Sequence, residues 1–171
     1  ATAPLTAETT TQGGTDMHML VFSMGKEEYA FALTEISEIM KTLPLTPVPH
    51  APTAVRGIVN IRGKVATVVD LATVFGLQGD TATKEYMIVA EYEKNLYGML
   101  VDGVSGVLRT STQYLKKTPE VFSAKAAAPY INGALVIPGE KESRIILTLN
   151  LPAMFASVAS VSSRSQYATH T

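Results

Sequence analysis

Short runs of β-branched and apolar residues, separated by glycine, proline and charged residues, recur along most of the chain. Runs of this kind are typical of β-strands, because branched and aromatic side chains fit a pleated, half-buried surface. Helical spacing of apolar residues is brief, at residues 34–40 and directly after Asp70 and Asn150. The pattern predicts a mostly β protein with short helices. Strands are expected at residues 19–23, 29–33, 55–61, 64–69, 86–91, 96–101, 130–137 and 144–149.

The second half of the chain repeats the first. EYAFALTEISEIM, from Glu28, matches LYGMLVDGVSGVL, from Leu96, and GIVNIRGK, from Gly57, matches GALVIPGE, from Gly133. A unit of roughly 65 to 70 residues is marginally stable alone, and closing a sheet removes its exposed edges. The repeat therefore predicts two small β-barrels of about five strands each, which share apolar surface.

The repeat also sets the expected domain boundaries. Two duplicated subdomains are expected at about residues 17–83 and 84–156, and an exchange of strands or helices between them is left open. Residues 1–16 and 157–171 are rich in Thr, Ser and Ala and show little periodicity. Such composition is typical of flexible tails.

The composition of the chain excludes several classes of function. The chain has 171 residues, no cysteine and a net charge of -1. The charge does not indicate nucleic acid as a partner, and the lack of cysteine excludes disulfides, thiol catalysis and cysteine-ligated zinc. No window approaches the length of apolar sequence that a spanning helix needs, so no direct membrane insertion is expected. A cytoplasmic protein is predicted.

Comparison of the two copies separates structural residues from functional ones. Gly63 matches Gly139, so a tight turn with a positive φ is expected in both copies. Arg62 matches Pro138, which suggests that the turn does not require a guanidinium. We therefore interpret Arg62 as a residue that serves a partner outside the fold.

Catalytic chemistry is not indicated. Asp70 matches Asn150, and both precede Leu-x-x-x-Phe, which favours N-caps over an acid–base role because both side chains offer an oxygen to helix N–H groups. His18, His50 and His170 form no triad and no metal-spaced cluster, and no nucleotide-binding motif is present. We expect no enzyme, no cofactor and no metal. A hydrolase based on Asp70 and His50 is the alternative.

Three segments together resemble the CheW family of chemotaxis coupling proteins: MLVFSMGKEEYAFALTEISEIM, then PLTPVPHAPTAVRGIVNIRGKVATVVDLATVFGL, then YGMLVDGVSGVL. The resemblance covers residues 17–155. It implies two SH3-like five-stranded barrels packed through a shared hydrophobic interface. It also implies a scaffold that links chemoreceptor signalling tips to the regulatory domain of the histidine kinase CheA. A coupling protein of a twitching or other chemosensory pathway is the alternative.

The resemblance further implies where the partners bind. A helical hairpin of the receptor would enter a groove between the barrels, with apolar anchors and charges at the rim. Phe122, an aromatic residue in the long loop of the second copy, is expected to contact the kinase or other CheW copies in rings, and the alternative is that it pins this loop to the barrel. The protein would be recruited from the cytoplasm to membrane-associated receptor arrays. The residues expected to form the groove are Leu33, Ile36, Glu38, Ile39, Gly57, Arg62, Val101, Val104 and Leu108. For Glu38, a solvated charge beside the core is an equal alternative.

Overall fold

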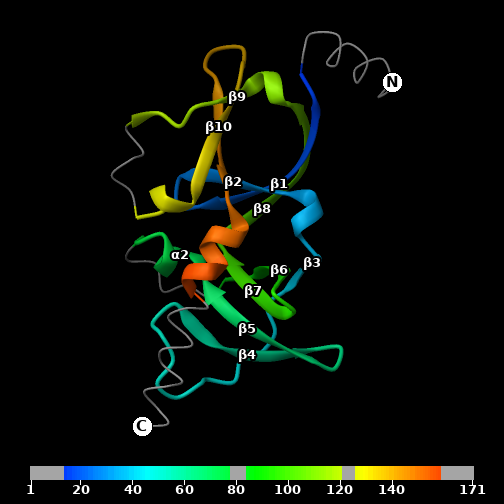
Figure 1. The fold of residues 1–171 in the computed structure, drawn as a ribbon, viewed down its shortest axis with the longest axis vertical. Helices are drawn as coiled ribbons and strands as arrows, with labels where there is room; N and C mark the ends of the chain where they lie inside the picture. The colour runs from blue at the N-terminus through cyan, green and yellow to red at the C-terminus, as the bar shows by residue number, and fades with distance from the viewer. Residues whose placement is uncertain (1–13, 78–83, 121–125, 159–171) are drawn as a thin grey trace.

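The computed structural model describes residues 14–77, 84–120 and 126–158 as two small β-barrels, one above the other in Figure 1. The prediction of a mostly β fold with short helices is confirmed. Strands occupy β1 (Asp16–Met24), β2 (Glu27–Ala32), β3 (Glu38–Lys41), β4 (Val55–Ile61), β5 (Lys64–Asp70), β6 (Tyr86–Tyr92), β7 (Asn95–Val101), β8 (Gly103–Ser111), β9 (Leu115–Lys116), β10 (Ile131–Ile137) and β11 (Arg144–Leu149). The helical turns are η1 (Leu33–Glu35), α2 (Leu71–Val74), η2 (Thr112–Tyr114), η4 (Ala128–Tyr130) and residues 151–158.

The two sheets combine strands from both halves of the sequence. One sheet has the order β8-β1-β2-β11-β10-β9, and we call it the terminal barrel. The other has the order β3-β6-β7-β5-β4, and we call it the central barrel. Most neighbours are antiparallel, but β2 and β11 are parallel, and so are β5 and β7. The sheets therefore do not divide at residues 83 and 84, because β6 and β7 join the strands of the first half.

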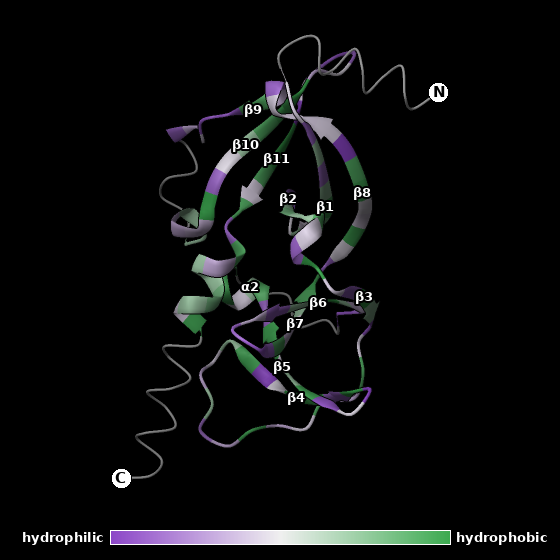
Figure 2. Cartoon of the chain, turned by 45° about the vertical axis from the view of Figure 1, so that its right-hand side comes forward, coloured by the Kyte–Doolittle hydropathy of each residue, from purple (hydrophilic) through white to green (hydrophobic). Residues whose placement is uncertain are grey.

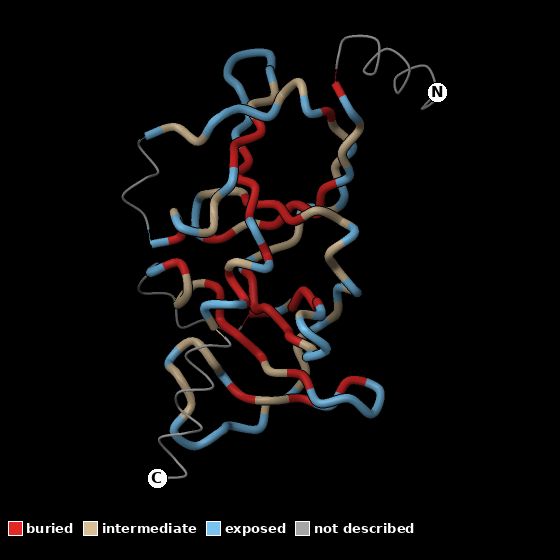
Figure 3. Tube along the Cα trace, viewed as in Figure 1, coloured by how far each residue is buried: buried red, intermediate tan, exposed pale blue. Residues whose placement is uncertain are grey.

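Three groups of buried side chains fill this architecture. Each barrel has its own small core, and a larger core contains side chains from both barrels. Along β1, Leu20 and Phe22 lie in the shared core, while Met19 and Val21 lie in the core of the terminal barrel. This alternation follows from the period of two in a β-strand. Buried segments run through the middle of the molecule in Figure 3, where the barrels meet.

Aromatic contacts in the shared core repeat with the sequence. Tyr29 of β2 packs against Phe75, just after α2, with ring centroids 4.8 Å apart. The matching residues of the second copy, Tyr97 and Phe155, stack at 4.4 Å. In each pair the two rings come from different barrels, so the pairs hold the barrels together from both sides. Burial raises the pKa of Tyr29, and the nearby carboxylate of Glu27 raises it further.

The prediction of a helix at residues 34–40 is wrong. Only Leu33–Glu35 forms a helical turn, and Glu38–Lys41 is strand β3, paired antiparallel with β6. Apolar spacing over seven residues does not distinguish a helix from a turn followed by a strand. The matching segment of the second copy also forms a strand, β8, along which hydrophobic and hydrophilic residues are mixed (Figure 2).

Both copies contain a β-bulge beside a glycine. The register of β4 on β5 shifts between Val55 and Gly57, and the register of β10 on β11 shifts between Ile131 and Gly133. A Cβ on Gly57 would lie 2.6 Å from the carbonyl oxygen of Thr46, and the residue has φ +155. The glycine is therefore required for close backbone approach at the bulge.

The turn at Arg62 and Gly63 is tight, with φ +49 and +85. Two positive φ values identify the hairpin turn whose twist matches that of the flanking strands. The side chain of Asn60 accepts a hydrogen bond from the Gly63 N–H at 2.8 Å. Arginine is an unusual residue for the first position, where asparagine or glycine is preferred.

The corresponding connection of the second copy is different. Residues 138–143 link β10 to β11, and Gly139 does not have a positive φ. The expectation of the same turn in both copies is therefore wrong. Proline cannot adopt the φ of Arg62, because its ring fixes φ near -65°. Pro138 thus gives no information on whether the turn tolerates proline at Arg62.

Candidate docking groove between the barrels

Four residues predicted for the groove belong to the shared core or pack against it. Val101, at the end of β7, is fully buried in the shared core. Leu33, Ile36 and Val104 are half-buried and pack against the same core. The turn of η1, closed by a hydrogen bond from the Ile36 N–H to the Leu33 carbonyl at 3.1 Å, places two of these side chains on one side. They form an apolar surface that is partly open to solvent.

Glu38 and Arg62 form an ion pair on the central barrel. Arg62 Nη1 donates to Glu38 Oε1 at 3.2 Å, and Nη2 donates to Glu38 Oε2. The pair joins β3 to the turn between β4 and β5, which brings together the two edge strands of this sheet. The side chain of Arg62 is still 71% exposed, so the pair contributes at most about 1 kcal/mol to folding. Arg62 therefore has a partner within the fold and remains accessible to one outside.

Among the other predicted groove residues, Ile39 is 39% exposed on edge strand β3 and pairs there with Ile88 of the shared core. The remaining two lie elsewhere. Leu108 of β8 packs against the core of the terminal barrel, opposite Met19. Gly57 is buried in its bulge. Phe122, predicted as a kinase or ring contact, lies outside the described residues.

An ion pair at the connection between β7 and β8, with a buried lysine, was not predicted from the sequence. Asp102, where β7 continues into β8, pairs with Lys84, whose side chain is only 7% exposed. Asp102 also accepts a hydrogen bond from the Gly25 N–H at 2.6 Å, and its own N–H donates to the Ser23 carbonyl at 3.1 Å. These contacts fix the crossover between the barrels to the β1–β2 turn, directly between Val101 and Val104. Neither Lys84 nor Asp102 has an identical residue at the matching position of the other copy, so the sequence repeat did not indicate this ion pair.

The ion pair at the crossover predicts a pH dependence of stability. Burial acts to raise the pKa of Asp102, but the hydrogen bonds from Lys84 and Gly25 outweigh it, and the pKa lies below its usual value. The folded state thus holds this carboxylate deprotonated more strongly than the unfolded chain does. We expect the free energy of unfolding to fall as the pH drops below about 5, and to fall less in Asp102→Asn. Urea unfolding at a series of pH values measures this, and equal slopes for both proteins would contradict it.

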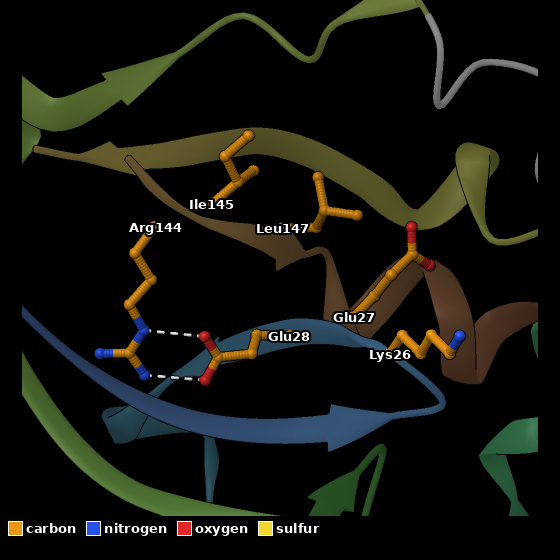
Figure 4. A pocket seen from close by; sticks show the side chains of 6 residues that line it. All are labelled: Lys26, Glu27, Glu28, Arg144, Ile145 and Leu147. Carbon is orange, nitrogen blue, oxygen red and sulfur yellow. Dashed lines mark hydrogen bonds and ion pairs between the residues drawn. The ribbon is translucent and has the colours of Figure 1, made fainter. Parts of the chain in front are cut away.

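A third ion pair connects the parallel strands β2 and β11. Arg144 Nε and Nη2 each donate to one oxygen of Glu28 at 2.8 Å (Figure 4). The hydrogen bonds from Arg144 lower the pKa of Glu28. The hollow beside this pair is also lined by Lys26 and by apolar residues such as Ile145. Because the guanidinium and carboxylate satisfy each other, the pair is a clamp between the halves of the sequence.

The proposed catalytic carboxylate is a helix cap. The side chain of Asp70 accepts a hydrogen bond from the Ala72 N–H at 3.0 Å at the start of α2. Asn150 accepts one from the Ala153 N–H at 3.1 Å at the start of residues 151–158. Asp70 is also paired with Arg56, at 3.0 Å. Within the described residues, no group of His, Cys, Asp or Glu could hold a metal ion.

Comparison with known proteins gives the family. Residues 18–159 match the model of the CheW-like domain. The chain belongs to the CheW-like family. The chemotaxis protein CheW of Rhizobium meliloti is 32% identical over 86% of this chain and 91% of the relative. A probable chemotaxis protein CheW of Rhizobium etli is 30% identical over 85% of this chain and 91% of the relative.

A solved structure supports the fold of this CheW-like chain. The crystal structure of the scaffolding protein TtCheW from Thermoanaerobacter tengcongensis superposes with a TM-score of 0.70. The match has 24% sequence identity and covers 81% of this chain and 92% of that one. The predicted pair of SH3-like barrels is therefore confirmed. Across the described residues, no helix is long and apolar enough to span a membrane.

Proposed function

We propose that this CheW-like chain is a chemotaxis scaffold that couples chemoreceptors to the histidine kinase CheA. Two chemotaxis CheW relatives match over 91% of their length, and the structural relative TtCheW is a scaffolding protein. In this role the protein supports receptor control of kinase activity. It acts in the cytoplasm, at arrays of receptors associated with the membrane.

The partly exposed apolar surface at the junction of the barrels carries the proposal for receptor binding. Three apolar side chains are partly exposed to solvent and pack against the shared core, namely Leu33, Ile36 and Val104. A helical hairpin of the receptor would cover these side chains, because apolar anchors on a helix bury well in a groove. The charges of Glu38 and Arg62 would then set the register of the helix. Phe122 remains the proposed contact with the kinase or with further copies in a ring.

Reconstitution tests the function. The purified protein is added to membranes that contain the receptor, together with CheA, and autophosphorylation of the kinase is measured. We expect activity that depends on both receptor and coupling protein. Equal activity with and without the protein would contradict the proposal.

A substitution of Arg62 tests whether this residue contributes to assembly with partners or only to the stability of the fold. Replacing Arg62 with alanine should change the free energy of unfolding by at most about 1 kcal/mol, because the ion pair to Glu38 is largely exposed. The same replacement should weaken assembly with receptor or kinase, measured by co-sedimentation with receptor membranes. Glu38→Ala, which removes the other half of the pair, is the matched variant. A large loss of stability together with normal assembly would show that Arg62 serves only the turn.

A coupling protein of a twitching or other chemosensory pathway is the second candidate. Protein PilI of Pseudomonas aeruginosa is 26% identical over 66% of this chain and 63% of that protein. The match is weaker than those to CheW proteins, so the chemotaxis assignment is preferred. Capture of the tagged protein from its own cells, followed by identification of the copurified receptor and kinase, distinguishes the two.

A further inference from the structure

Val104, proposed above as part of the receptor surface, lies in a short segment at the start of β8. The register of β8 on β1 changes from Val21 opposite Gly106 to Phe22 opposite Val104, so Ser105 is an extra residue in β8 and forms a bulge. Only the first two residues of β8 lie before this bulge. A bulge interrupts the ladder and bends the strand. The regular pairing after the bulge therefore does not by itself fix the position of Val104.

Asp102 anchors the other end of this segment through three groups. Its backbone N–H donates to the carbonyl oxygen of Ser23 at 3.1 Å. Its carboxylate accepts a hydrogen bond from the Gly25 N–H at 2.6 Å through Oδ2, and it pairs with Lys84 through Oδ1. Gly25 lies between β1 and β2 with φ +62. Val104 thus lies between a bulge and an anchor that holds the connection between the barrels to a turn of the terminal barrel.

The two side-chain contacts of Asp102 have different consequences. The ion pair compensates the charge of Lys84, whose side chain is only 7% exposed, and an unpaired charge at a buried site costs stability. The hydrogen bond from Gly25 is exposed, so water can replace the carboxylate there at little cost in stability. Water cannot replace the link between the two backbone segments. This hydrogen bond therefore contributes mainly to position, in the way that contacts outside an interface hold a binding residue in place.

We propose that Asp102 is a positioning residue for receptor binding, and that its hydrogen bond from Gly25 holds Val104 in place on the receptor surface. The inference rests on the proposed function, because it adds a residue outside the proposed surface on which the affinity for the receptor depends. Val101, directly before Asp102, is fully buried in the shared core, so the chain is fixed on that side. Without the hydrogen bond, only the short pairing before the bulge and the backbone of Asp102 hold Val104. Its half-buried side chain would then shift relative to the other apolar side chains of the surface.

Variants in a Lys84→Met background separate positioning from stability, because no buried ammonium is left unpaired when Asp102 is replaced. Lys84→Met alone keeps the hydrogen bond from Gly25 and is the control. Adding Asp102→Ala removes this hydrogen bond, and adding Asp102→Asn restores an acceptor oxygen. Binding of the full chain to receptor membranes is measured by co-sedimentation, well below the melting temperature of each variant. The methyl signals of Val104 are recorded by ¹H–¹³C NMR in the free protein.

We expect the control to bind like the wild-type protein. The alanine variant should bind about tenfold more weakly and show shifted Val104 methyl signals, since misplacing one anchor of an interface commonly has an effect of this size. The asparagine variant should bind like the control, with unchanged methyl signals. Equal binding or unchanged methyl signals in the alanine variant would overturn the proposal. Weak binding in the asparagine variant, or a loss of affinity that is already complete in Lys84→Met, would also overturn it.

Two provisions keep the result decisive. Asp102→Leu, which keeps the shape of aspartate without an acceptor, replaces the alanine variant if that variant does not fold. If the wild-type protein itself does not bind receptor membranes, the proposed function is contradicted, and the methyl signals alone decide whether Asp102 holds Val104 in place.

Discussion

Replacing Gly57 with valine should lower the free energy of unfolding by roughly 2–4 kcal/mol, the largest loss of stability that we expect from a single exchange in this fold. Two causes act together. A Cβ would lie 2.6 Å from the backbone oxygen of Thr46, and a φ of +155 is unfavourable for a branched residue. Denaturant unfolding of the two proteins measures the loss.

Gly63→Asn is the matched control for Gly57→Val. Gly63 also has a positive φ, but no atom lies within 4 Å of the position of a Cβ, and asparagine tolerates this conformation. We expect a change of less than about 1 kcal/mol. If both variants lose the same stability, the contact with Thr46 is not the reason why position 57 is a glycine.

Replacing Ile39 with aspartate should reduce the affinity for the receptor at least about tenfold while the protein stays folded. The side chain is 39% exposed on β3, beside the Glu38–Arg62 pair, so the charge stays solvated in the free protein. In the complex it would be buried against apolar side chains of the receptor, and an unpaired charge there is costly. Binding to receptor membranes is measured by co-sedimentation.

Val65→Asp is the control for the receptor surface. Val65 lies on β5 of the same barrel and is 61% exposed, but it is not among the proposed groove residues. We expect normal binding. If both aspartate variants bind normally, β3 does not form part of the receptor site, and the groove is limited to the surface over Val101.

The sequence revealed those features that depend on side-chain pattern. Most strands of six or more residues were located, but the nine-residue strand β8 was not predicted. The repeat paired Tyr29 with Tyr97 and Phe75 with Phe155, which form equivalent contacts across the barrel interface. The short strand Glu38–Lys41 was missed, because its few residues fit helical spacing equally well. A local pattern cannot settle such a segment, since its partner strand lies 45 or more residues away.

Features that depend on contacts between distant residues could not be predicted in this way. The pairing of Arg62 with Glu38 requires that the two edges of one sheet meet, and the pairing of Lys84 with Asp102 requires the crossover between the barrels. The alignment of the copies also failed at residues 138–143, where a longer connection replaces the tight turn. Equivalent positions in a repeat share a backbone path only as far as the strands extend.

In the sequence, strands β3 to β7 of the central barrel lie between β2 and β8 of the terminal barrel. This arrangement sets the order in which a nascent chain can fold. The strands of the central barrel are complete when the ribosome has released Val101, whereas the terminal barrel still lacks β8 to β11. Strands β1 and β2 of the terminal barrel are synthesised first. Until the later strands are made, the core residues Leu20, Phe22 and Phe31 lack some of the neighbours that bury them in the folded protein. Slow translation after Val101 would therefore prolong an intermediate with exposed β1 and β2, which is the state most open to chaperones and to aggregation.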